Sequence, residues 1–216
     1  MKKIYNKKIK YLICIPILFI LYTLICAYSY ANTISSDLQE SVFRLHVIAN
    51  SDSEEDQNLK YVVRDKLIEY MNTLSINTTS KEDVINLANE HINDFYAIAN
   101  NTIQDYGYDY PVKINIGNFN FPTKTYGDIS LPAGYYDALR VEIGEAKGQN
   151  WWCVMFPPLC FVDVSSGIVP DSSKELMKEN MSEEDYSLIS ENSSEIKLKF
   201  KIIEMFQNTK ILTAQN

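Results

Sequence analysis

The chain has 216 residues, 46% hydrophobic and 22% charged, a composition typical of a folded protein rather than a disordered one. Five lysines and no acidic residues lie in residues 1–31. The rest of the chain therefore holds 15 of the 20 basic residues and all 28 acidic ones, a net charge near −13. A body this acidic is repelled by phosphate backbones, which argues against nucleic-acid binding.

The first 31 residues have the three parts of an export signal. Lysines at positions 2, 3, 7, 8 and 10 precede an uncharged, mostly apolar run, Tyr11–Ala27, and Ser29-Tyr30-Ala31 offers small residues for cleavage. The same run is near the lower limit of a spanning helix, ~17 residues, so a membrane anchor over residues 11–28 is the alternative to a cleaved signal peptide. Both readings place the body outside the cytoplasm.

Residues 32–41 are polar and are predicted to form a linker to the body. The segment 42–48 alternates as a strand does, with Phe43, Leu45 and Val47 on one face and Arg44 and His46 on the other. If helices cover the apolar face, Arg44 and His46 point away from them. We therefore expect both to be exposed, and their replacement to affect signalling more than stability.

Two helices follow this strand. Ser53 and Asp56 form a variant of the capping box at the start of the first helix. Apolar residues at helical spacing predict that this helix extends to about residue 74. Ser80 caps a second helix, which Gly107 ends. His91 lies beside the apolar stripe of this second helix and is interpreted as a boundary histidine with a local partner.

The hydrophobic period then changes to two. Val112, Ile114 and Ile116 predict a strand, and Gly117-Asn118 predicts a hairpin turn from which the chain returns through Phe119 and Phe121. Further strands are predicted over residues 134–143 and 151–156, joined by a loop at 144–150. The polar residues 171–194 are interpreted as short helices at 174–179 and 182–190, with a mobile excursion as the alternative. A last strand is predicted at 196–202.

This order of elements predicts an α+β fold, a mainly antiparallel sheet with two helices packed on one face. Residues 42–206 would form one extracytoplasmic domain, and residues 207–216 a flexible tail.

Cys153 and Cys160 are the two cysteines of the predicted exported body, since Cys14 and Cys26 lie in the leader. An even count in an oxidising compartment indicates a disulfide, and two reduced, buried cysteines are the alternative. A cysteine hydrolase would need a thiolate beside a base, but the apolar neighbours of Cys153 would favour the neutral thiol over the thiolate. The sequence has no zinc-ligand spacing and no phosphate-binding loop, so we predict no metal, no cofactor and no catalytic residues.

Trp151, Trp152 and Phe156 give the last strand a large aromatic area of the kind found in binding hot spots. A core role is the alternative for each of them. Because neighbouring residues of a strand point to opposite faces, the two tryptophans cannot lie on one side.

Four motifs occur in order along residues 44–161: RLHVIANSDS, D-Q-x-L-K, P-A-G-x-Y-x-A-L-R-V and G-x-x-K-G-x-N-W-W-C-V-x-F-P-P-L-C-F. With them the chain resembles the stage II sporulation protein R family. The resemblance implies a non-enzymatic signal, secreted from the forespore into the intermembrane space. There it would activate a membrane-embedded, aspartic-type protease that processes pro-sigma-E in the mother cell. We predict that Arg44, His46, Trp151, Trp152 and Phe156 bind this partner; an extracytoplasmic cysteine hydrolase acting on cell wall or peptide is the rival hypothesis.

Overall fold

The structure is a computed structural model that describes residues 2–76, 78–160 and 168–190. The predicted last strand and tail lie outside this range. The elements in chain order are α1 Lys2–Ser41, β1 Phe43–Ile48, α2 Glu54–Leu74, α3 Lys81–Glu90, α4 Ile92–Asp105, β2 Val112–Phe121, β3 Lys124–Tyr126, β4 Ile129–Leu131, β5 Gly134–Ile143, β6 Asn150–Phe156, α5 Asp171–Asn180 and α6 Glu183–Ser190.

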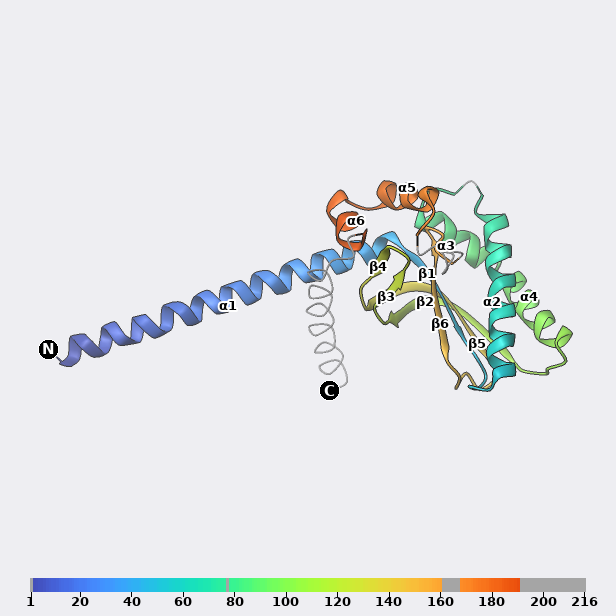
Figure 1. Ribbon diagram of the computed structural model, residues 1–216, viewed down its shortest axis with the longest axis horizontal. Coiled ribbons are helices and arrows are strands. Elements are labelled where there is room, and N and C mark those ends of the chain that lie inside the picture. Colours follow the sequence, from blue (N-terminus) through green and yellow to red (C-terminus); the bar gives the residue numbers. More distant parts are fainter. Residues whose placement is uncertain (1, 77, 161–167, 191–216) are drawn as a thin grey trace.

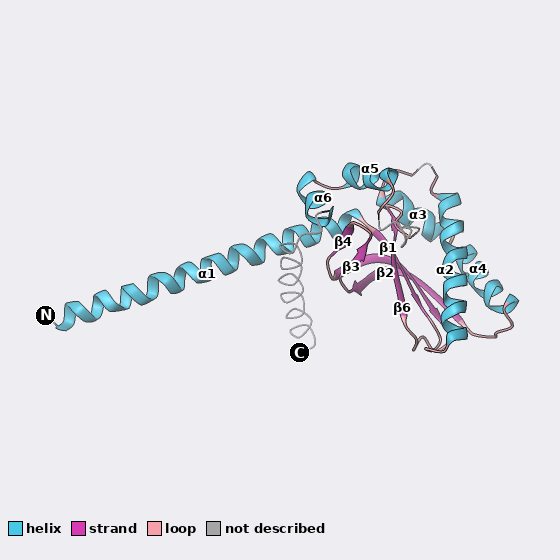
Figure 2. Cartoon of the chain, in the orientation of Figure 1, coloured by secondary structure: helices cyan, strands magenta, loops and turns pink. Residues whose placement is uncertain are grey.

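A four-stranded sheet with the strand order β2-β5-β1-β6 forms the centre of the body (Figure 2). β1 is parallel to β5 and antiparallel to β6, and β2 is antiparallel to β5. β3 and β4 form a separate two-stranded hairpin. The predicted α+β class with a mainly antiparallel sheet is confirmed.

Helices α2, α3 and α4 cover one face of the sheet, where Phe43, Leu45 and Val47 lie in the larger hydrophobic core (Figure 1). The hydroxyls of Ser53 and Ser80 accept hydrogen bonds from backbone amides in the first turns of α2 and α3, as their positions predict. The predicted second helix is divided in two, because His91 leaves helical geometry and lies at both the end of α3 and the start of α4.

The other face of the sheet holds a second core, made by the β3–β4 hairpin, α5, α6 and the last turn of α1. Leu38 is fully buried in this core, and Lys81 Nζ donates to the Gln39 carbonyl at 2.8 Å. The expected linker at 32–41 is therefore helical, and its end is packed on the body. Within the described residues, no helix has the combined length and hydropathy needed to cross a membrane. The division into leader, linker and extracytoplasmic domain stays a prediction.

The hairpin turn predicted at Gly117-Asn118 is wrong. β2 continues through it, and all ten of its residues pair with β5. Ile114 and Ile116 pack on the helix side, whereas Phe119 and Phe121 pack into the second core. The apolar positions change parity here because the buried face changes along the strand, a pattern that a turn would also produce.

Candidate functional site

The two tryptophans of β6 lie on opposite faces of the sheet, and each is half-buried. Trp151 packs under α2, where the Arg64 guanidinium lies 4.2 Å from its ring centroid and the Tyr61 ring lies edge-on at 5.5 Å. Trp152 stacks on His46 on the other face, with ring centroids 3.7 Å apart. The expectation that they cannot share a face is met, and their partner-binding role stays a prediction.

Arg44 lies on the face opposite the helices, as predicted, but it is fully buried there, so the expectation of exposure is wrong. The β3–β4 hairpin brings Tyr126 to it, and Arg44 Nη2 donates to the Tyr126 hydroxyl at 2.7 Å. The guanidinium carbon lies 4.1 Å from the ring centroid of Phe121 and 4.7 Å from that of Tyr136. Among the described residues no carboxylate pairs with Arg44, and its Nε and Nη1 have no hydrogen-bond partner.

His46 is also buried rather than exposed, because its ring is covered by Trp152 and approached edge-on by Phe121. Its Nε2 lies 2.7 Å from Asn150 Oδ1, an acceptor, so Nε2 carries the proton and Nδ1 has no partner. Burial lowers the pKa of His46 to about 4, and the nearby Arg140 and Arg44 act in the same direction against the Asn150 hydrogen bond. His46 is therefore neutral near pH 7.

We expect the protein to lose stability on acidification because of His46. The folded-state pKa of about 4 lies below the ordinary value of 6.5, so the unfolded chain binds a proton first as the pH falls between these values. The loss should reach on the order of 2 kcal/mol at pH 4.5, after allowance for solvent screening. Urea unfolding at pH 7.5 and pH 4.5 measures it. A His46→Phe variant keeps a ring against Trp152 and should show a smaller pH dependence; an unchanged one would contradict this assignment.

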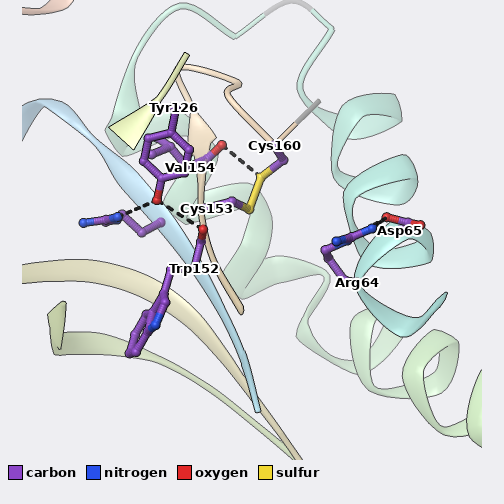
Figure 3. Close-up of a disulfide and its surroundings, with 8 residues drawn as sticks. Arg64, Asp65, Tyr126, Trp152, Cys153, Val154 and Cys160 are labelled. Carbon is purple, nitrogen blue, oxygen red and sulfur yellow. Dashed lines mark hydrogen bonds and ion pairs between the residues drawn. A yellow bond between two sulfur atoms is a disulfide. The ribbon is translucent and has the colours of Figure 1, made fainter. Parts of the chain in front are cut away.

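Cys153 and Cys160 form the predicted disulfide, with Cα atoms 5.3 Å apart (Figure 3). The chain reverses after β6 through a cis peptide bond between Phe156 and Pro157. The Leu159 amide then donates to the Val154 carbonyl at 3.0 Å, and the Cys160 sulfur lies 3.1 Å from the same oxygen. The bridge therefore holds the returning chain against the end of an edge strand. Neither sulfur is a thiolate in this form, so the bridged pair does not supply the nucleophile of a cysteine hydrolase.

Phe156 is almost fully buried at the same end of β6 and belongs to the larger core, and its role in partner binding stays a prediction. With Met155 and Pro158 it lines a cleft of about 720 Å³ between the end of α2 and α5. Ile76, Pro170 and Leu176 complete the apolar part of this cleft, and serine, threonine and asparagine residues line the rest.

Sequence reasoning missed a junction between two loops at the far end of the sheet from α1. The loop after β1 and the loop between β5 and β6 are joined by backbone hydrogen bonds, from Lys147 to Asn50 and from Gly148 to Ala49. A Cβ atom at Gly148 would lie 2.1 Å from the Ser51 carbonyl oxygen, so only glycine fits there. Gly144 is restricted in the same way, with a positive φ of 60°.

Asp56, in the first turn of α2, is the buried acid of this junction. Its carboxylate accepts from Asn50 Nδ2 at 2.8 Å and from the Ser51 hydroxyl at 2.5 Å. Burial alone would raise the pKa of Asp56, but the hydrogen bonds from Ser51, Asn50 and Tyr110 hold it below its usual value. Lys60 is buried nearby and donates to the Gln149 carbonyl at 3.1 Å. These contacts hold the loop after β1 and the loop between β5 and β6 together at this end of the sheet.

The described residues contain no group of three or more histidine, cysteine or acidic side chains that could hold a metal ion.

The family model described as Stage II sporulation protein R matches residues 39–166. Stage II sporulation protein R of Bacillus subtilis (strain 168) is 38% identical over 130 residues, which cover 60% of this chain and 58% of that relative. This chain thus spans less than two thirds of the length of the curated relative. No solved structure matches. The match includes β1 to β6, both joined loops and the disulfide, and the chain belongs to the Stage II sporulation protein R family.

Proposed function

We propose that this protein is a secreted sporulation signal that activates a membrane-embedded, aspartic-type protease across the intermembrane space and so leads to processing of pro-sigma-E. Membership of the family supports the sporulation role. Secretion, the protease and the sigma factor rest on the resemblance of the motifs, and the lysine-rich, apolar N-terminus supports export.

One observation carries the choice of a binding protein over an enzyme: the reactive side chains of the motifs are committed to structural contacts. Cys153 is in a disulfide, and the buried Asp56 carboxylate accepts two side-chain hydrogen bonds. His46 is stacked on Trp152 and hydrogen-bonded to Asn150. A rigid body of this kind would act by binding one state of its partner more tightly than another, which shifts the partner towards that state.

Export is expected to be necessary for the signal. A chain without residues 1–31 keeps Leu38 and the packed last turn of α1, so it should fold. Expressed only in the forespore of a host that lacks its own copy, it should give no sigma-E-dependent transcription in the mother cell, measured with a fluorescent reporter. The full-length chain should restore transcription.

The control is the truncated chain behind an unrelated, cleavable export signal, which should signal as the full-length chain does. A truncated chain that stays in the forespore cytoplasm and still activates mother-cell transcription would overturn the proposal.

A further inference from the structure

Only part of the second face of the sheet is covered by the β3–β4 hairpin and its neighbours. Beyond the hairpin, side chains from three strands reach the surface on this face. Lys113, Asn115 and Phe119 come from β2, and Arg140 pairs with Asn115 from β5. Trp152 comes from β6, opposite His46. Lys113 and Asn115 are exposed, and the other three are half-buried. We call Lys113, Phe119, Arg140 and Trp152 the cationic face.

Two cations of this face share one carboxylate. Arg140 Nη2 lies 2.7 Å from Glu142 Oε1, and Lys113 Nζ lies 3.6 Å from Glu142 Oε2. Arg140 Nε is buried without a hydrogen-bond partner, and Arg44, deeper in the same face, has no carboxylate partner among the described residues. Among the described residues of this face, positive charge therefore exceeds negative charge, although the chain outside residues 1–31 has a net charge near −13. A surface of this sign attracts carboxylates that the rest of the body repels.

Contacts with neighbouring side chains hold the aromatic rings of the cationic face in place. The Arg140 guanidinium lies 5.3 Å from the Phe119 ring centroid. Trp152 is fixed by its stack on His46 and by Phe121, whose ring centroid lies 4.7 Å away. Half-exposed aromatic rings beside an arginine have the composition of binding hot spots, and rings already fixed lose little conformational entropy on binding.

We propose that the cationic face is the docking surface for a carboxylate-bearing segment of a partner protein. Lys113 and Arg140 would pair with its acidic side chains, while Trp152 and Phe119 contact its apolar ones. The inference rests on the proposed function, under which the segment belongs to the extracytoplasmic part of the protease.

The chain offers a matched pair of lysines for the test. Lys113 and Lys66 have 69% and 56% of their side chains exposed, and each lies within 4 Å of a glutamate. Lys66 lies on α2, which covers the other face. Lys113→Glu in the full-length chain should lower the sigma-E reporter signal at least fivefold, and Lys113→Glu with Arg140→Glu should abolish it. Lys66→Glu should stay within twofold of the unchanged chain. Each variant places a second carboxylate beside a glutamate, so both should lower the melting temperature by a similar, small amount.

Contact is measured by placing the photo-crosslinking residue benzoylphenylalanine at Asn115 in sporulating cells and sequencing the crosslinked peptide. We expect a peptide with at least two acidic residues, whose yield falls at least fivefold with Lys113→Glu and not with Lys66→Glu. A neutral or basic peptide, a lipid adduct, or a yield insensitive to Lys113→Glu would overturn the docking surface.

The two proposals fail differently. If the full-length chain signals and the Lys113→Glu, Arg140→Glu variant signals equally well, the docking surface is wrong and the proposed function stands. If a charge-dependent crosslink forms to an acidic segment of a protein other than the protease, the docking surface is supported and the proposed partner is wrong.

Discussion

Replacing Arg44 with alanine is expected to lower the free energy of unfolding by about 3–5 kcal/mol. The side chain is fully buried, so its removal leaves a cavity between the rings of Phe121 and Tyr136. The substitution also removes the donor to the Tyr126 hydroxyl, which lies on the hairpin that covers this core. Equilibrium unfolding in urea gives the value.

Arg44→Met separates volume from charge. Methionine fills most of the same space, and it removes a guanidinium whose Nε and Nη1 have no partner. Since replacing a buried charge with a well-packed apolar residue is often neutral or stabilising, we expect Arg44→Met to lie within about 1 kcal/mol of the wild type. A methionine variant as unstable as the alanine variant would show that the charge itself stabilises the fold. A large loss for Arg44→Ala would replace the expectation, drawn from strand alternation, that Arg44 affects signalling more than stability.

Asp56→Ala should cost about 3 kcal/mol or more, because it leaves the Asn50 amide and the Ser51 hydroxyl without their acceptor at a buried loop junction. Asp65→Ala is the control, since Asp65 lies on the same helix with 56% of its side chain exposed and should cost less than about 0.5 kcal/mol. Thermal and urea unfolding of the two variants give the comparison. Similar losses for both would contradict the role of the junction.

The same carboxylate has a defined pH window. Its folded-state pKa lies below 3.8, so its contribution is present above pH 3.8 and is lost as the pH falls through the lower folded value. Asp56→Asn, which carries no charge at any pH, should lack this part of the acid sensitivity. This window lies below that of His46, which ends near pH 4.

Features set by neighbouring residues were predictable from the sequence. The Ser53 and Ser80 caps lie where the cap pattern places them, because a cap joins residues only three apart. The opposite directions of Trp151 and Trp152 follow from the strand period alone. The disulfide followed from cysteine count and the proline-rich bend between its two residues.

Features set by distant residues were not predictable. Nothing local shows that a hairpin from residues 124–131 covers Arg44, so a charged residue at an outward position was expected to be exposed. The joined loops of the candidate site are almost 100 residues apart, and neither Ala49 nor Gly148 carries a local sign that its loop contacts the other. The change of buried face along β2 has the same origin.

The central position of β1 has a consequence for how the chain folds. Arg44 pairs with Ala138 on one side and with Val154 on the other, so the first strand to be synthesised waits about a hundred residues for both neighbours. Helices α2, α3 and α4 can form earlier, but the sheet surface on which they pack is incomplete until β6 has emerged. Such non-local pairing gives a high contact order and slow folding. Until β5 has emerged β1 has two open edges, and a chain cut between β5 and β6 leaves one edge of β1 open.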